Sequence, residues 1–149
     1  MSYTLRKALL PDLAILADHN QAMALETEQR ELDRATIEAG LMAVLMDPHK
    51  GFYLIAEQDG RIAGNLMITF EWSDWRNGTM WWFQSVYIRP EHRNRGVFRQ
   101  MYDYILNDAR RKNVKEVRLY VDKENASAQQ VYEALGMEQS HYLMYEVGL

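Results

Sequence analysis

A short segment between an expected strand and an expected helix has the residue types that bind an anion. Arg93, Arg95 and Gly96 follow Pro90, which ends a strand pattern, and Gly96 opens a helical pattern. The first turn of a helix has unpaired N–H groups and a partial positive charge, and glycine lets the backbone approach an anion closely. Flanking arginines add charge-assisted hydrogen bonds. The segment therefore predicts a diphosphate site; the alternative is a loop glycine beside solvated arginines.

The distribution of charge also favours an anionic ligand. The 149 residues carry a net charge of −4, yet nine basic and four acidic residues lie between Arg89 and Arg118. A basic segment in an acidic protein indicates one anionic ligand held at one place. The overall acidity argues against a nucleic-acid partner. No apolar run approaches the roughly 18 residues of a membrane span, so we expect no membrane partner.

Composition narrows the chemistry further. Hydrophobic residues make up 48% and charged residues 26%, which is typical of a globular protein. The chain has no cysteine, which excludes disulfides, thiolate metal sites and an acyl-cysteine intermediate. The four histidines show no ligand spacing, so we expect no metal. The chain shows no repeat or linker, and its start lacks the apolar core of a signal peptide. We therefore expect a single domain over residues 1–149 in the cytoplasm.

Hydrophobic periodicity and turn residues predict an order of mixed α/β elements. Val97, Met101 and Ile105 recur at four-residue spacing, which indicates one buried helix face. Asp59-Gly60 and Asn77-Gly78 predict tight hairpin turns, Asn125 a helix cap and Gly136 a left-handed helix end. Strands are expected at 3–8, 52–57, 62–71, 79–88, 117–121 and 141–147, and helices at 11–24, 33–46, from 96 onward and from 125 to before 136.

Two segments in this order resemble the hallmark motifs of the GCN5-related N-acetyltransferases, the GNAT superfamily. The first, Arg93-Asn94-Arg95-Gly96-Val97-Phe98, resembles the acetyl-CoA loop Arg/Gln-x-x-Gly-x-Gly/Ala. The second, from Asn125 to Met137, resembles Asn-x-x-Ala-x-x-x-Tyr-x-x-x-Gly-Phe/Met. The resemblance covers essentially the whole chain. It implies a mixed α/β, α+β-like fold: a central, mostly antiparallel sheet flanked by helices, with a splayed strand pair that holds CoA.

The resemblance also implies acetyl-CoA as cofactor and assigns its contacts. The pantetheine arm would pair with the backbone of the strand before the loop, the diphosphate would bind the loop, and the second motif would contact the cofactor and its sulfur. Phe98 stands where the family prefers Gly or Ala, so either the loop is wider there or Phe98 points into the core. The implied cofactor-binding residues are Val86, Tyr87, Ile88, Arg93, Asn94, Arg95, Gly96, Val97, Phe98, Arg99, Asn125 and Tyr132.

The implied reaction is acetyl transfer to a primary amine of a small molecule or peptide. Tyr132 would be the general acid, because a phenol of pKa about 10 can protonate a thiolate whose conjugate acid has a pKa of roughly 8.5. A buried structural tyrosine is the alternative. The absence of cysteine favours direct attack in a ternary complex. Many relatives place a glutamate where Gln84 and Ser85 stand here, a departure that also leaves open a non-catalytic acyl-CoA-binding or interaction module.

The proton acceptor and the amine site are expected on the acidic and aromatic segments. The residues leave the base unassigned: Glu71, which we take as the candidate catalytic base, Asp74 and Glu28 are all possible, with a plain surface carboxylate as the alternative for each. All four tryptophans lie within residues 72–82, and aromatic rings with carboxylates bind amines by cation–π attraction and ion pairing. Packing or a homodimer contact is the alternative explanation. The expected acceptor-binding residues are Glu28, Trp72, Asp74 and Trp75.

Overall fold

The computed structural model describes residues 2–149, which form two compact units that divide between Leu119 and Tyr120. Each unit is described by itself. The elements of the first unit are β1 (Thr4–Lys7), η1 (Leu10–Asp12), α1 (Leu13–Glu28), α2 (Arg34–Met46), β2 (Gly51–Gln58), β3 (Arg61–Ser73), β4 (Gly78–Ile88), η2 (Pro90–His92), α3 (Val97–Arg111) and β5 (Glu116–Arg118). The second unit contains α4 (Ala126–Ala134).

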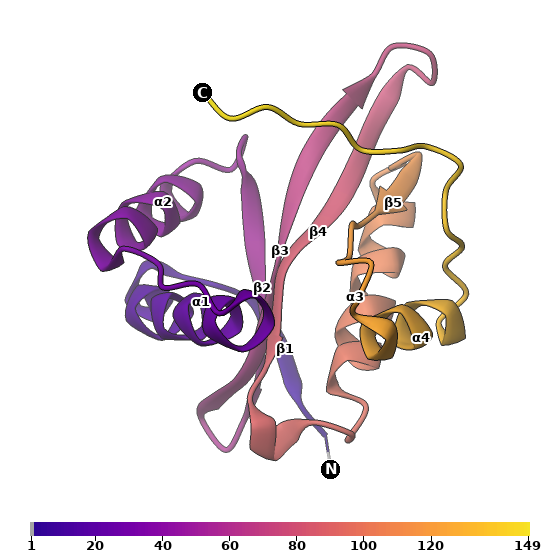
Figure 1. Ribbon diagram of the computed structural model, residues 1–149. Coiled ribbons are helices and arrows are strands. Elements are labelled where there is room, and N and C mark those ends of the chain that lie inside the picture. The colour runs from indigo at the N-terminus through magenta and orange to yellow at the C-terminus, as the bar shows by residue number, and fades with distance from the viewer. Residues whose placement is uncertain (1) are drawn as a thin grey trace. The chain divides into compact units, whose positions relative to one another are not determined.

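The first unit is a five-stranded sheet in the order β1-β2-β3-β4-β5. Strands β1 to β4 pair antiparallel, and β5 pairs parallel to β4. Helices α1 and α2 lie on one face of this sheet and α3 on the other (Figure 1). The predicted mixed α/β fold with a mostly antiparallel central sheet is therefore confirmed. None of the helices within residues 2–149 is long and apolar enough to cross a bilayer.

Each face of the sheet buries a separate apolar layer. Under α1 and α2, Leu16, Leu41 and Ile55 are at most 2% exposed. On the other face, α3 buries Val97, Met101 and Ile105, also at most 2% exposed, which confirms the helix face predicted from their spacing.

The two predicted hairpin turns differ in length. Asp59 and Gly60 both have positive φ (53° and 73°), as a two-residue type I′ turn requires, and that prediction is confirmed. At the second hairpin β4 already begins at Gly78, and the turn spans residues 74–77. Side chains stabilise the longer turn: Asp74 accepts a hydrogen bond from the Trp75 N–H (2.9 Å) and Ser73 one from the Arg76 N–H (3.2 Å).

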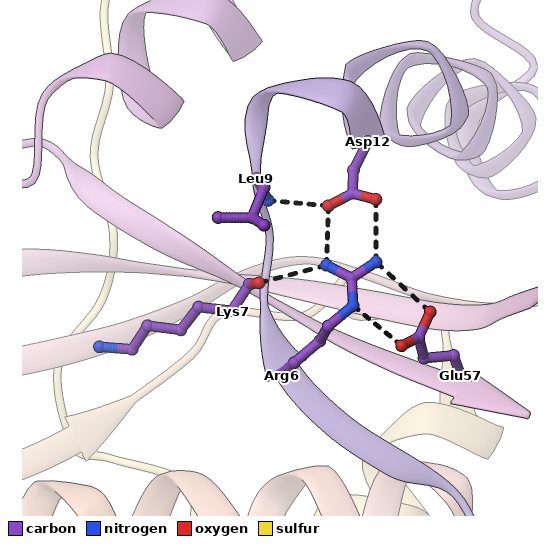
Figure 2. A network of polar contacts seen from close by, with 5 residues as sticks. All are labelled: Arg6, Lys7, Leu9, Asp12 and Glu57. Atoms are coloured by element: carbon purple, nitrogen blue, oxygen red, sulfur yellow. Dashed lines mark hydrogen bonds and ion pairs between the residues drawn. The ribbon is translucent and has the colours of Figure 1, made fainter. Parts of the chain in front are cut away.

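An arginine between two carboxylates fixes the path from β1 into the first helix (Figure 2). Arg6 donates to both carboxylate oxygens of Asp12 at 2.8 and 2.9 Å, and to Glu57 of β2 at 2.9 Å. Asp12 also accepts the Leu9 N–H at 2.7 Å, which holds the turn into η1. These hydrogen bonds, those from Arg6 first, lower the pKa of Asp12.

The second unit contains the predicted helix but not the predicted last strand. Asn125 caps α4 by accepting the Ala128 N–H, and Gly136 adopts φ 96°, while the Met137 N–H bonds the Tyr132 carbonyl (3.0 Å), which completes a Schellman end. The strand expected at 141–147 is wrong. That segment has no strand partner within the second unit, and its Tyr145 is 88% exposed. The strand expected at 117–121 is shorter in the structure and ends at Arg118.

Candidate functional site

The predicted anion-binding loop leads into α3 with its backbone in two left-handed turns. Asn94 has φ 61° and Gly96, the residue that caps α3, has φ 75°. Gly96 has no side chain with which to cap this helix end. The first N–H groups of a helix have no partner within it, so this end of α3 presents backbone donors, such as those of Val97 and Arg99, toward which an anion is attracted. A Cβ on Gly96 would meet no atom within 4 Å, so the backbone here is open to close approach.

The three arginines of the loop differ in their contacts. Arg95 and Arg99 are exposed, and within residues 2–149 neither forms an ion pair or a side-chain hydrogen bond. Both are therefore free to bind an anion. Arg93 is engaged: its Nη2 lies 2.9 Å from the Glu26 carboxylate and its Nε donates to the Ile88 carbonyl at 2.9 Å.

Arg93 thus connects the end of β4 to the end of α1 through its hydrogen bond and its ion pair. Its guanidinium also lies 5.5 Å from the ring centroid of Tyr87, whose hydroxyl contacts Glu26 at 3.4 Å. This internal use of a loop arginine was not predicted. The only sequence signal for it is the acidic residue at 26, which is 67 positions away.

Phe98, the departure from the family motif, packs against the sheet. Its ring centroid lies 6.1 Å from that of Phe83 on β4 and 6.2 Å from that of Tyr102 on α3. Of the two alternatives that the sequence left open, the structure therefore shows the one in which Phe98 points into the core.

The end of β4 extends beyond its neighbour β5. Pairing with β5 is limited to Met80, Trp81 and Trp82, whereas β4 continues to Ile88. On the other side, the register with β3 shifts between Asn65 and Met67, so that Ser85 and Val86 form a bulge. The segment Val86–Ile88, predicted to pair with a pantetheine arm, thus lies where β5 no longer covers the edge of β4.

A network of buried hydrogen bonds stabilises this bulge. Asn65, 1% exposed, donates from Nδ2 to the Ser85 carbonyl at 3.0 Å, and its Oδ1 accepts from His19 Nδ1 at 2.6 Å. Burial lowers the pKa of His19, which favours the neutral imidazole. Ser85 itself sits at φ 50°, an unfavourable conformation for a residue with a side chain. Sequence reasoning missed this network, because no motif connects residues so far apart.

A cavity of about 310 Å³ lies beside the bulge, on the sheet face covered by α1 and α2. Its polar lining consists of Asn20, Lys50, Tyr53, Thr69 and Ser85, and its apolar lining of Ile37, Leu41, Val44 and Met67, with Gly40 completing the wall. The lining contains no carboxylate. The Tyr53 hydroxyl accepts from Asn20 Nδ2 at 3.2 Å and is hydrogen-bonded to the Ser85 side chain, and burial raises its pKa.

The residues predicted to bind or deprotonate the amine do not line this cavity. Glu71 lies two positions beyond Thr69 on β3, where its carboxylate accepts from Trp82 Nε1 (2.9 Å) and pairs with Arg118 (3.5 Å). Trp72 and Trp75 are 63% and 91% exposed. Asp74 stabilises its own turn, and Glu28 is an exposed residue at the end of α1. Their roles toward an acceptor stay predictions.

In the second unit, the second motif lies on α4 as predicted. Asn125 Oδ1 accepts from the Ala128 N–H (3.2 Å) and from the Ser127 hydroxyl (3.3 Å), so this atom serves as the helix cap. Tyr132 is half-buried, and burial raises the pKa of its hydroxyl. A raised pKa keeps the phenol protonated at neutral pH, as a proton donor must be.

The site thus consists of a left-handed glycine at the start of α3 and of a bulged strand, β4, that extends beyond its parallel neighbour β5. The sequence profile of the Acetyltransferase (GNAT) family matches residues 13–137, and the chain belongs to this family. The family assignment supports acetyl transfer as the activity. A search of curated proteins returned no match.

Solved structures agree with this assignment. A protein from Clostridium difficile 630 described as a possible acetyltransferase is 39% identical, with a TM-score of 0.94 over 100% of this chain and 99% of that one. A predicted acetyltransferase from Clostridium acetobutylicum, solved with acetyl-CoA, is 20% identical, with a TM-score of 0.79 over 97% and 96%. A ribosomal-protein-alanine N-acetyltransferase from Brucella melitensis biovar Abortus 2308 is 15% identical, with a TM-score of 0.80 over 99% of each chain.

Proposed function

We propose that the protein transfers the acetyl group of acetyl-CoA to a primary amine by direct attack in a ternary complex. The observation that carries the proposal is the uncapped, left-handed entry into α3, where Gly96 stands between two unpaired arginines, Arg95 and Arg99. A diphosphate fits this donor set, because backbone N–H groups, the helix dipole and guanidinium groups all favour a compact dianion. The similar fold solved with acetyl-CoA supports the same cofactor.

The remaining contacts of the cofactor follow from the end of β4. Val86, Tyr87 and Ile88 would pair with the amide groups of the pantetheine arm along the edge that β5 leaves uncovered. The Ile88 carbonyl already accepts from Arg93, so this pairing rests mainly on Val86 and Tyr87. Asn94 positions the loop through its own left-handed turn.

When bound, acetyl-CoA supplies an activated thioester, and the protein handles the protons. A free alkylamine has a pKa near 10.4, so loss of its proton at pH 7 costs about 4–5 kcal/mol. We propose Glu71 as the acceptor of this proton and Tyr132 as the donor to the departing thiolate. Because the chain has no cysteine, an acyl-cysteine relay is impossible, which favours direct attack of the amine on the thioester.

Calorimetry with CoA and a thiol-release assay with acetyl-CoA and a panel of amines test the proposal. We expect Tyr132→Phe to lose turnover while CoA still binds, and Tyr145→Phe, an exposed tyrosine of the same unit, to behave like the native protein. Absence of heat on CoA titration would refute the proposal. Binding of CoA without turnover of any amine would instead support a non-catalytic acyl-CoA-binding module.

A separate variant tests the base. Glu71→Gln keeps an oxygen that can accept the Trp82 N–H but cannot take a proton. If Glu71 is the base, kcat falls at neutral pH and recovers as the pH approaches the pKa of the amine, where free amine is abundant. An unchanged pH–rate profile in Glu71→Gln would remove Glu71 from the mechanism.

A further inference from the structure

The cavity beside the bulge has a chemistry that selects an acceptor. Four apolar side chains form much of its wall, and its polar groups are neutral apart from Lys50. The Lys50 ammonium already lies 3.0 Å from the Asp47 carboxylate, so its charge is locally compensated. No lining side chain is an acid that could pair with an ammonium group.

The polar groups of the wall are also paired with one another. Asn20 donates to the Tyr53 hydroxyl, Tyr53 is hydrogen-bonded to Ser85, and Gln84 donates to the Thr69 hydroxyl at 3.5 Å. A ligand with many charged groups would have to give up hydration without gaining new counter-ions. A ligand with an apolar body instead gains free energy in proportion to the apolar area that it buries.

We propose that this cavity binds the body of the acceptor, and that the acceptor is a primary monoamine with an aryl-alkyl or branched alkyl body rather than a polycationic amine. The inference rests on the proposed function, because it is the extension of β4 next to Ser85 that would bring the thioester to this wall. Ser85 belongs both to the bulge and to the cavity lining, so an amine at the inner end of the cavity lies beside the segment Val86–Ile88.

Gly40 is an exposed residue of the cavity lining, from which a larger side chain would narrow the space for this body. It lies three positions after Ile37 and four before Val44 on α2, so the three share one helix face, and all three line the cavity. A Cβ built on Gly40 meets no atom within 4 Å. A side chain can therefore start from this position without a clash at its Cβ, and replacing a glycine inside a helix does not disfavour the helix.

The test compares Gly40→Leu with Ala39→Leu, which places the same side chain on an exposed neighbouring position outside the lining. For the native protein, kcat/KM with phenethylamine should exceed that with spermidine by at least about tenfold. Gly40→Leu should lower kcat/KM for phenethylamine by about tenfold or more, chiefly through KM, while Ala39→Leu leaves it unchanged. Phenethyl alcohol, which has the apolar body but no amine, should compete with phenethylamine in the native protein and not in Gly40→Leu.

Two results would overturn the inference: preferred turnover of spermidine, or equal behaviour of Gly40→Leu and Ala39→Leu. Failure of the proposed function looks different, because then no amine is acetylated at all. In that case calorimetry of phenethylamine with the CoA-saturated protein still decides whether the cavity binds an apolar amine. Heat in the native protein that disappears in Gly40→Leu supports the cavity, and no heat in either protein refutes it.

Discussion

Removing the Asn65 side-chain amide should destabilise the protein by more than the small size of this group suggests. Asn65 is 1% exposed and connects two groups, accepting from His19 at 2.6 Å and donating to the Ser85 carbonyl at 3.0 Å. Asn65→Leu keeps a similar volume but leaves both partners without a hydrogen bond in a buried place. Each unsatisfied group costs about 1–3 kcal/mol, so the expected loss is about 2–6 kcal/mol. Such a loss is a large part of the 5–15 kcal/mol that typically stabilises a domain.

Urea unfolding measures this loss as a lower midpoint at an unchanged m-value. Asn107→Leu is the matched control: Asn107 is exposed on α3, and within residues 2–149 its side chain accepts one hydrogen bond, from Arg110 at 3.4 Å, so the substitution should change stability by less than about 0.5 kcal/mol. Asn65 hydrogen-bonds the carbonyl of Ser85, whose φ is 50°. Without this hydrogen bond the bulge should relax, and kcat/KM should fall by more than the loss of folded protein accounts for. If Asn65→Leu unfolds at the native midpoint, the network does not hold the bulge and the reasoning is wrong.

Three further predictions concern the loop and the first turn of the fold. Arg95→Ala should weaken CoA binding by about 10- to 100-fold, corresponding to one charge-assisted hydrogen bond of about 1.5–3 kcal/mol, whereas Arg61→Ala, at the start of β3 and outside the predicted cofactor set, should not change the calorimetric Kd. Gly96→Val should destabilise the protein by about 1–2 kcal/mol in urea because its φ of 75° is left-handed, and should weaken CoA binding as well; native-like values for both would show that the turn is not required. The lowered pKa of Asp12 implies stability that is present above its unfolded pKa of about 3.9 and is lost as the pH falls through the lower native value. Asp12→Asn should remove this acid-sensitive contribution, seen as a flatter dependence of unfolding free energy on pH below about pH 4.

Local patterns predicted most of the first unit. The four-residue spacing of Val97, Met101 and Ile105 identified the buried face of α3, and Asp59-Gly60 identified a two-residue turn, because both signals act within one or two turns of the chain. The turn after Ser73 was predicted too short, since side-chain hydrogen bonds stabilise a longer one. The strand at 141–147 was wrong because alternation shows only that a segment suits a sheet. It does not show that a partner strand is present.

The loop before α3 could be recognised in the sequence and the cavity could not, for a physical reason. Arg95, Gly96 and the start of α3 are neighbours in sequence, so their chemistry can be seen in one short motif. The cavity is assembled from Asn20 on α1, Gly40 on α2, and three strands beyond them, and none of these residues has a type that signals a site. The bulge that joins the loop and the cavity contains no glycine. Tertiary hydrogen bonds hold Ser85 at φ 50° instead.

The ion pairs of the acidic segment at residues 26–38 bear on which forces would bind the cofactor and which the acceptor. Acidic residues near 26–38 suggested a cationic acceptor, but Glu26 pairs with Arg93 and Glu38 with Arg34, so two of these charges are used inside the protein. The ion pair with Glu26 also engages Arg93, so Arg95 and Arg99 are the loop arginines that the proposed function assigns to the diphosphate. The cavity lining contains no carboxylate. On these proposals, charge would select the cofactor, and shape and burial of apolar surface would select the acceptor.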